Sequence, residues 1–536
     1  MDGERTQALL PRLERSGSAT RLIVDQEPFI IRGGELGNSS VERAFLQRYW
    51  PKLQALGLNT IVAPVYWDVV EPEEGVFNWS TVDELIDDAR EHGMRLVLLW
   101  FGTWKNSMSC YAPSWVKTDF ERFPRCRDSL GRSMEILTPF GDANREADAR
   151  AFTALMAHLR SQDEQHAVVL VQVENEIGMI PEARDHSPQA EAAFNAAVPG
   201  ELISYLQQHR EELAPELLDL WTAAGERTAG TWTEVFGAGP LGEEVFMAWS
   251  FARYVQSVTA AGKAELGLPM YTNAALIRPA TLPGQYPSAG PLPHLIDVWR
   301  AGAPSLDFIA PDIYFPNFAE WAGKYTRSGN PLFIPEALRS VDAAANCLYA
   351  YGAHSAIGFA VFGVESISGR AEAMLAASND IVRQLSPLIA AHAGDSTMTG
   401  LLPPADDQRV PHRLRLGDVL LDVTYERIAP PSLADGVINE SGDRAEDTTR
   451  LPSAAIVIQT ADKEFVIGGM GVTVTFSPAQ AGAERFGILS CEEGGFEEGL
   501  WQHLRWLNGD ETHQGRHLRL VPGRAAIQRV KLYRYR

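Results

Sequence analysis

The chain is poor in cysteine and has no long apolar run. Its four cysteines, at positions 110, 126, 347 and 491 of 536, show no CxxC spacing, so free buried thiols are expected. Cys110 and Cys126 are close enough in sequence to pair, which the sequence does not decide. No stretch approaches the roughly 20 apolar residues of a membrane helix. Residues 1–18 lack the apolar core of a signal peptide, so a cytoplasmic location is expected, with a removed export signal left open.

Positive charge is also scarce. The chain carries 47 Lys and Arg against 69 Asp and Glu, a net charge of −22. Nucleic acids and anionic membranes require clustered basic residues, so neither is expected as a partner. The 12 histidines form no HxxH or HExxH pair, and His513 and His517 are separated by Gly515. No metal ion and no cofactor are therefore expected.

The run 168–173 is the clearest strand in the chain. It is apolar except at position 172 and rich in β-branched residues, which predicts a strand buried on both faces. It leads directly into Glu174-Asn175-Glu176. In an α/β barrel, catalytic groups lie where a strand meets its following loop, so a carboxylate here is a candidate for chemistry. The alternative is that these acids cap a following helix.

Seven further apolar strands alternate with amphipathic helices. Strand, helix and strand at this spacing predict a parallel sheet with right-handed crossovers. Eight strands close a (β/α)8 TIM barrel, and the missing GxGxxG or Walker motif argues against an open doubly wound sheet. The expected strands cover residues 29–32, 59–65, 95–101, 168–173, 269–273, 306–314, 331–336 and 356–363; the expected helices include 41–56, capped by Ser40, 81–92, 147–160, 243–266 and 371–385, stopped by Pro387.

Two regions depart from this alternation. Residues 181–247 are helix-rich and are expected to form an insertion between the fourth strand and its return helix. After about Gly394, short alternating stretches punctuated by Pro, Gly and Asp predict an all-β sandwich. We expect a barrel with an N-terminal β-hairpin over residues 1–394, and a β-sandwich domain over residues 395–536.

The polar residues at the carboxyl ends of the expected strands are carboxylates, amides, phenols and indoles, with little Lys or Arg and no His. Amides and carboxylates bond to hydroxyl groups, and aromatic faces stack on pyranose rings, although ordinary packing is the alternative for each aromatic residue. A phosphorylated substrate would require basic residues or a glycine-rich loop. A neutral polyhydroxylated ligand, such as an oligosaccharide, is therefore expected. The candidate binding residues are Glu35, Tyr66, Trp67, Trp104, Asn106, Asn175, Asn273, Tyr314 and Glu365.

Two acids stand out by position. Glu176 follows the fourth strand and Glu336 ends the seventh, and these strands can face each other across the mouth of an eight-stranded barrel. Glycoside hydrolysis needs such a pair, because one carboxylic acid protonates the leaving oxygen and one carboxylate attacks the anomeric carbon. The pair lies about 5–5.5 Å apart in retaining enzymes and farther apart in inverting ones. A helix-capping or ion-pairing role is the alternative for Glu336.

The string QVENE at 172–176 resembles the acid/base motif of family 35 glycoside hydrolases, the β-galactosidases. Residues 34–40, and 63–67 with Glu71-Pro72, also resemble a bacterial branch of that family with a C-terminal β domain. The resemblance implies a retaining exo-β-galactosidase, with Glu176 as proton donor, Glu336 as nucleophile and Asn175 bonded to the sugar 2-hydroxyl.

The chain departs from that family at Gly37, where a His is frequent, and at Ile177, where a Tyr is usual. These departures leave the sugar open, so a retaining β-glycosidase acting on glucosides, fucosides or arabinosides is one alternative. A non-catalytic carbohydrate-binding barrel is another, and a metal-dependent hydrolase is disfavoured by the missing histidine ligands. The linkage, the role of the β domain and homo-oligomer formation also stay open.

Overall fold

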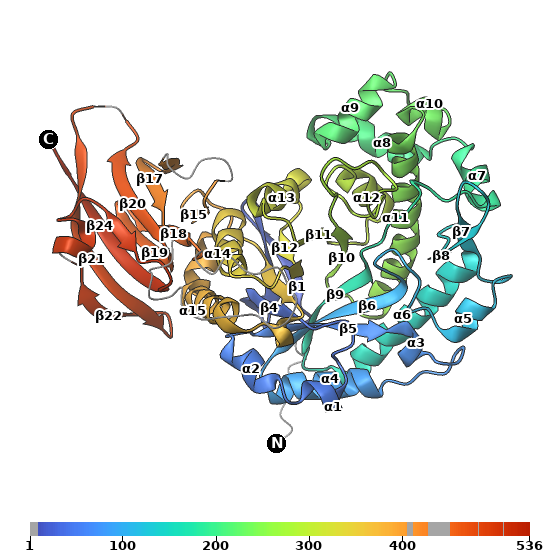
Figure 1. Cartoon of the computed structure of the whole chain (residues 1–536), viewed down its shortest axis with the longest axis horizontal. Helices are drawn as coiled ribbons and strands as arrows, with labels where there is room; N and C mark the ends of the chain where they lie inside the picture. The colour runs from blue at the N-terminus through green and yellow to red at the C-terminus, as the bar shows by residue number, and fades with distance from the viewer. Residues whose placement is uncertain (1–8, 405–410, 427–450, 481, 508) are drawn as a thin grey trace.

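Figure 1 shows the chain as one barrel with a smaller β region beside it. The structure is a computed structural model that describes residues 9–404, 411–426, 451–480, 482–507 and 509–536. In these ranges, no helix is both long enough and apolar enough to cross a membrane. All four cysteines are free, so Cys110 and Cys126 are not paired, and Cys110 is exposed rather than buried.

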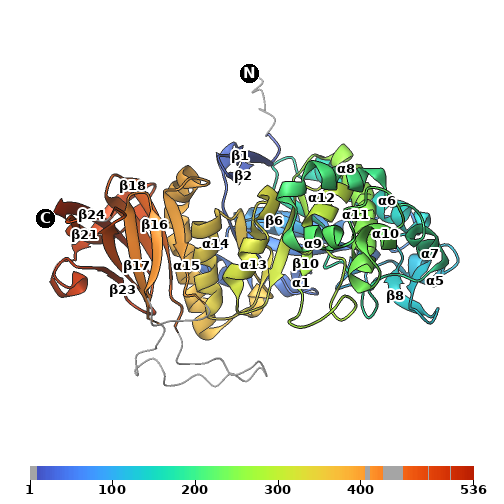
Figure 2. The ribbon, with the colours of Figure 1, turned by 90° about the horizontal axis from the view of Figure 1, so that it is seen from above.

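A small antiparallel sheet precedes the barrel. Its strands are β1 (Arg12–Ser16), β2 (Ala19–Val24) and β3 (Glu27–Pro28), paired in sequence order. An N-terminal β-hairpin was expected, and the structure has three strands here instead of two. Leu22 and Val24 pack against interior residues of the barrel strands. The sheet therefore covers one end of the barrel, where Figure 2 shows β1 and β2.

Eight chain segments form a closed parallel barrel, so the expected fold class is confirmed. Its strands pair in the order β12-β14-β4-β5-β6-β9-β10-β11-β13. The seventh segment supplies both ends of this order, since β12 pairs with β14 and β13 pairs with β11. Pro335 separates its two halves, because proline has no N–H for the ladder. The strands are β4 (Ile31–Glu35), β5 (Thr60–Tyr66), β6 (Arg95–Lys105), β9 (Val168–Asn175), β10 (Met270–Ala275), β11 (Phe308–Ile313), β12 (Phe333–Ile334), β13 (Glu336–Ala337) and β14 (Gly358–Phe362).

Helices surround these strands in Figure 1. Two expected helices differ from their predictions. The helix expected over 41–56 is split in two because Pro51 opens a new helix, and Ser40 is not its cap. The last helix continues through Pro387, with Ile389 buried beyond it. The outer helices are α1 (Arg43–Leu46), α2 (Trp50–Ala55), α3 (Trp67–Val70), α4 (Ser80–Glu91), α5 (Ser114–Thr118), α6 (Asp142–Gln162), α11 (Pro240–Glu265), α12 (Ile296–Gly302), α13 (Phe318–Lys324), α14 (Asp342–His354) and α15 (Gly369–His392).

Short helices lie between β9 and α11, in the region expected to be a helical insertion. Figure 1 shows them grouped at one side of the barrel. They are α7 (Pro188–Phe194), α8 (Gly200–Gln208), α9 (Pro215–Ala223) and α10 (Trp232–Phe236). A two-stranded hairpin, β7 (Arg125–Arg127) and β8 (Ser133–Leu137), precedes α6 and was not expected.

The C-terminal region is a β-sandwich of two antiparallel sheets, and the expected boundary at 394–395 falls between α15 and its first strand. One sheet has the order β15-β18-β19-β24-β21-β22 and the other β16-β17-β20-β23, with one apolar cluster drawn from both. The opposite face of the larger sheet packs on the barrel's core through residues such as Ile456 and Ile527. The strands are β15 (Met398–Leu401), β16 (His412–Leu416), β17 (Val419–Tyr425), β18 (Ala454–Ala461), β19 (Glu464–Met470), β20 (Val472–Pro478), β21 (Arg485–Glu497), β22 (Leu500–Trp506), β23 (Leu518–Leu520) and β24 (Ala526–Tyr535).

Side chains alternate between the barrel interior and the surrounding helices. Along β11, Phe308 and Ala310 belong to the interior cluster, whereas Ile309 and Ile313 belong to the cluster shared with the helices. The period of two therefore directs Asp312 into the barrel, at the carboxyl end of its strand.

Candidate active site

The acid-rich end of β9 has an unusual backbone. Glu174 and Glu176 have φ values of 62° and 45°, in the left-handed region that non-glycine residues seldom adopt. The segment after β6 holds this backbone, because the N–H of Asn106 donates to Asn175 O at 3.2 Å and the N–H of Ser107 donates to Glu176 O at 3.0 Å. Such conformations persist where neighbouring structure fixes them. The Glu176 side chain is therefore directed by its surroundings.

Glu174 connects two neighbouring strands of the barrel. Its carboxylate is fully buried and accepts hydrogen bonds from the N–H groups of Thr103 and Trp104, at 3.2 and 2.6 Å. Burial, together with the negative charge of Asp148, raises its pKa well above the ordinary range. Glu174 thus joins β9 to the end of β6 and does not reach the barrel mouth.

Three carboxyl groups meet at the mouth of the barrel. One oxygen from each of Glu176, Asp312 and Glu336 lies within 4.8 Å of the other two. All three side chains are buried, with exposed fractions of 6%, 1% and 3%. The structure thus brings together the two acids that the sequence singled out, 160 positions apart. Their separation is close to that of a retaining pair and well short of the roughly 6.5–9.5 Å of an inverting pair.

Glu336 is surrounded by hydrogen-bond donors. The Tyr314 hydroxyl donates to Oε2 at 2.7 Å, and the amides of Asn175 and Asn273 donate to Oε1 at 3.3 and 3.4 Å. These donors pair both oxygens of the carboxylate and hold it in one orientation. A fixed orientation is what an attacking nucleophile requires.

Glu176 retains its proton to higher pH than an ordinary glutamate. Burial, followed by the negative charge of Glu336, raises its pKa to about 7, and Lys105 acts in the opposite direction. Asn106 Nδ2 donates to Glu176 Oε2, and Asn273 Oδ1 accepts from the Glu176 N–H at 3.0 Å. A carboxyl group that titrates near neutral pH can give a proton in one step and take one in the next.

Two more acids lie buried beside this pair. Glu35 ends β4, is fully buried, and has no hydrogen-bond partner on either oxygen within the described ranges. Burial, and then the charge of Glu336, raises its pKa well above the ordinary range. Asp312, which the sequence reasoning missed, accepts from Asn273 Nδ2 at 2.7 Å. The available signal was an acid at an inward position of an apolar strand.

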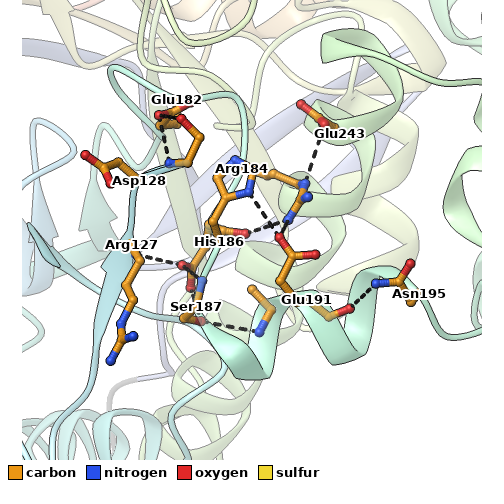
Figure 3. Close-up of polar contacts among 12 residues, drawn as sticks. Arg127, Asp128, Glu182, Arg184, His186, Ser187, Glu191, Asn195 and Glu243 are labelled. Atoms are coloured by element: carbon orange, nitrogen blue, oxygen red, sulfur yellow. Dashed lines mark hydrogen bonds and ion pairs between the residues drawn. The ribbon is translucent and has the colours of Figure 1, made fainter. Parts of the chain in front are cut away.

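The loop after β9 is anchored on two sides (Figure 3). Arg184 lies 2.8 Å from Glu191 Oε1 and 3.5 Å from Glu243 Oε1. Asp185 accepts the N–H of Arg127 at 2.8 Å, which ties the loop to the β7–β8 hairpin. These contacts fix the chain that continues from Glu176, and fixed orientation is what proton transfer to a bound substrate needs.

Two of the expected sugar platforms pack inside the protein. Trp67 and Trp104 are fully buried among other side chains, which favours the packing role that was the alternative for each aromatic residue. The Trp67 indole donates to Glu71 Oε2 at 2.7 Å. Trp104 packs on Phe251 and Tyr254, with ring centroids 5.1 and 4.5 Å away. The cause is local geometry: β6 runs on to Lys105, and Trp67 begins α3 instead of a loop.

Other candidate residues serve the structure of the mouth. The Tyr66 ring stacks on Tyr111, 5.3 Å between centroids. Glu365 accepts from Gly37 N at 3.2 Å and from the Ser40 hydroxyl at 2.8 Å. A Cβ at Gly37 would lie 2.8 Å from Glu365 Oε1, so the glycine makes room for this carboxylate. Ser40 was expected to cap the helix that follows it, but its hydroxyl donates to Glu365 instead.

The three clustered carboxyl groups are also close enough to share a cation. The neighbours of Asp312 and Glu336, however, are the amide groups of Asn175 and Asn273 and the hydroxyl of Tyr314, which donate hydrogen bonds to them. Donors satisfy a carboxylate but do not ligate a cation, whereas Ca²⁺ and Mg²⁺ sites collect oxygen acceptors. This set of groups fits proton sharing better than a metal centre.

Comparison with known proteins adds a family signal over part of the chain. Residues 39–224 match the family model described as β-galactosidase, that of glycoside hydrolase family 42. Residues 375–519 match a domain of unknown function, DUF5597. The general likeness to β-galactosidases holds, but the family number inferred from the motif is wrong, since the match is to family 42 and not family 35. The string QVENE was therefore too short to fix the family.

Individual relatives are distant. A β-galactosidase of Xanthomonas manihotis is 30% identical over 82 residues, 15% of this chain and 14% of that protein. The crystal structure of a β-galactosidase from the psychrophilic Marinomonas ef1 aligns with a TM-score of 0.48 at 14% identity, over 67% of this chain and 60% of that one. One from Bacillus circulans sp. alkalophilus gives 0.46 at 15% identity, over 67% and 57%. The chain thus spans less than two thirds of these relatives, and its fold rests on its own strand pairing.

Proposed function

We propose that this protein is a retaining exo-β-galactosidase that releases terminal non-reducing β-D-galactosyl residues from a neutral oligosaccharide or galactoside. The observation that carries the proposal is the close pair of buried glutamates, one titrating at about 7 and the other surrounded by donors. The match of residues 39–224 to a β-galactosidase family model supports the choice of sugar.

The reaction has two steps. Glu336 attacks the anomeric carbon while Glu176 gives its proton to the glycosidic oxygen, so the C–O bond breaks and a galactosyl ester forms on Glu336. Glu176, now ionised, takes a proton from water, and the oxygen of that water attacks the same carbon. The ester breaks, Glu336 regains its charge and Glu176 its proton. Each carboxyl group ends the cycle as it began.

The proposed sugar position is supported by buried oxygens that lack a hydrogen-bond partner. Asn175 Oδ1 and both oxygens of Glu35 are buried without a hydrogen-bond partner in the described part of the chain. Buried polar atoms are rarely left unpaired, so we assign them to hydroxyl groups of the substrate. Asn175 takes the 2-hydroxyl beside the anomeric carbon, because its Nδ2 already donates to Glu336. Asn273 and Tyr314 position Glu336 from the other side.

A panel of 4-nitrophenyl glycosides tests the proposal. The β-galactoside is expected to give the highest kcat/KM, with β-glucoside, β-fucoside and α-arabinoside lower. If another glycoside were preferred, the proposed mechanism would stand and the proposed sugar specificity would be wrong. No hydrolysis of any glycoside would leave the carbohydrate-binding alternative.

Two variants separate catalysis from binding. Glu336→Gln is expected to abolish turnover. Glu176→Ala is expected to form the galactosyl ester from substrates with good leaving groups, because that step then needs no proton donor, and to release the ester slowly. Ordinary activity in either variant on an unactivated galactoside would remove the assigned roles. A binding protein would tolerate both substitutions with its affinity for sugar unchanged.

A further inference from the structure

Asp312 is a buried acid for which the two-step reaction has no task. It lies in register with Glu336 on neighbouring strands, and one of its oxygens is within 4.8 Å of an oxygen of Glu176. Its exposed fraction is 1%. A third negative charge at this place would repel both other carboxylates in a setting with little water.

The hydrogen bonds of Asp312 indicate where a proton belongs. Asn273 Nδ2 donates to Asp312 Oδ2 at 2.7 Å, so this oxygen acts as the acceptor. Asp312 Oδ1 is fully buried and receives no donor from the described residues. An ionised aspartate would leave that oxygen unpaired, which is costly in a buried site. A proton on Oδ1 removes the charge and turns the unpaired acceptor into a donor, and Glu176, with an oxygen within 4.8 Å of one of Asp312, is an acceptor beside it.

We propose that Asp312 is a protonated carboxylic acid that donates a hydrogen bond to Glu176 and so positions the acid/base. The proposal rests on the proposed function and extends it by one positioning residue. Asp312 keeps its own proton throughout the cycle. Its donated bond is strongest when Glu176 is ionised, which is the form that activates water in the second step.

The charged neighbours agree with this assignment. Burial, then the charges of Glu336 and Glu176, raise the pKa of Asp312 well above the ordinary range. The bond from Asp312 acts the other way on Glu176 and lowers its pKa. Lys105 lowers the pKa of Glu176 as well. The titratable groups that act electrostatically on or around Asp312 are Glu35, Glu176, Tyr271, Tyr314, Tyr325 and Glu336.

Two substitutions at position 312 distinguish a neutral donor from a charge. Asp312→Asn keeps a neutral donor, because Asn273 continues to hold the oxygen side and the new amide NH2 faces Glu176. Asp312→Leu fills a similar volume with an apolar side chain and removes the donor. Asp297→Asn on α12 is the matched control, since Asp297 is also buried and accepts the Ala214 N–H at 2.7 Å.

The measurement is the pH profile of kcat/KM on 4-nitrophenyl β-galactoside. The wild-type basic limb is expected near pH 7, where free Glu176 loses its proton. Asp312→Asn and Asp297→Asn should leave it within about 0.3 units, and Asp312→Leu should raise it by about one unit, because Glu176 loses a donor. A fall of about one unit in Asp312→Asn would show an ionised Asp312 and overturn the proposal, and so would an unmoved limb in Asp312→Leu.

A second readout does not depend on activity. Infrared difference spectra of Asp312→Asn minus wild type at pH 7 are expected to lose one protonated-carboxyl C=O band, and Asp297→Asn serves as the reference. Loss of a carboxylate band instead would overturn the proposal even if the wild type hydrolysed no glycoside. Absence of all hydrolysis with loss of the carboxyl band would refute the proposed function and leave a protonated Asp312 beside Glu176.

Discussion

The hydroxyl of Tyr314 donates a hydrogen bond to Glu336 Oε2 at 2.7 Å. The residue is 37% exposed, while its hydroxyl contact with Glu336 is partly buried. Removing the donor in Tyr314→Phe leaves the attacking carboxylate less well oriented. We expect kcat on 4-nitrophenyl β-galactoside to fall about 10- to 100-fold, within the range for loss of one preorganised donor.

The control for Tyr314→Phe is its thermal midpoint, which should stay within about 2 °C of wild type because exposed substitutions change stability little. A normal kcat would show that this hydroxyl does not act on Glu336.

Glu176 links catalysis to stability. Its pKa is about 7 in the folded protein against an ordinary value of 4.5, so between these pH values the folded chain binds a proton that the unfolded chain has lost. Stability therefore falls as pH rises from about 4.5 to about 7, by roughly 3 kcal/mol at 1.36 kcal/mol per unit. Glu176→Gln cannot ionise, so urea unfolding should find it more stable than wild type at pH 8 and equally stable at pH 4. Equal stability at both pH values would contradict the raised pKa.

Trp104 should matter for stability and not for binding. Its indole is fully buried and donates to Leu137 O at 3.1 Å. Trp104→Phe leaves space in the core, and Leu137 O keeps only the weak Cys126 Sγ donor, so we expect a loss of about 1–3 kcal/mol in unfolding free energy. KM for the galactoside should be unchanged. A tenfold rise in KM at unaltered stability would restore Trp104 as a sugar platform.

Metal removal should have no effect. The donors around Glu336 and Asp312 are amides and a phenol, so the carboxyl cluster is assigned to proton sharing. Dialysis against EDTA is expected to leave kcat within about 20% of the untreated enzyme, and added Mg²⁺, Mn²⁺ or Ca²⁺ should not raise it. Loss of activity restored by one of these ions would show that the cluster binds metal.

The barrel could be predicted from the sequence because each strand is an apolar run and each helix has an amphipathic pattern. The run 168–173 and the acids that follow it were recognisable without tertiary information, and so was Glu336 at the end of its strand. The split of the seventh segment at Pro335 was not predicted, because it depends on which neighbour each half pairs with.

The contacts of single side chains were harder to predict. The burial of Trp104 was not predicted because the third strand was expected to end at residue 101, whereas β6 runs to Lys105. The burial of Trp67 was not predicted because a loop was expected where α3 begins. Tyr314, and not Asp312, was chosen as the candidate site residue of the sixth strand. The sequence does not show where that strand ends, so it does not show which of its last residues face the barrel interior. The requirement for glycine at position 37 could not be predicted, because it depends on contact with Glu365, 328 positions away.

The most direct test is to trap the covalent intermediate. A 2-deoxy-2-fluoro-β-galactoside with a good leaving group should inactivate the wild type and leave one fluorogalactosyl ester per chain, located by peptide mass spectrometry on Glu336. Glu336→Gln should take no label. A label on another residue, or none under conditions where the enzyme turns over galactosides, would contradict the pairing of Glu176 and Glu336 as acid/base and nucleophile.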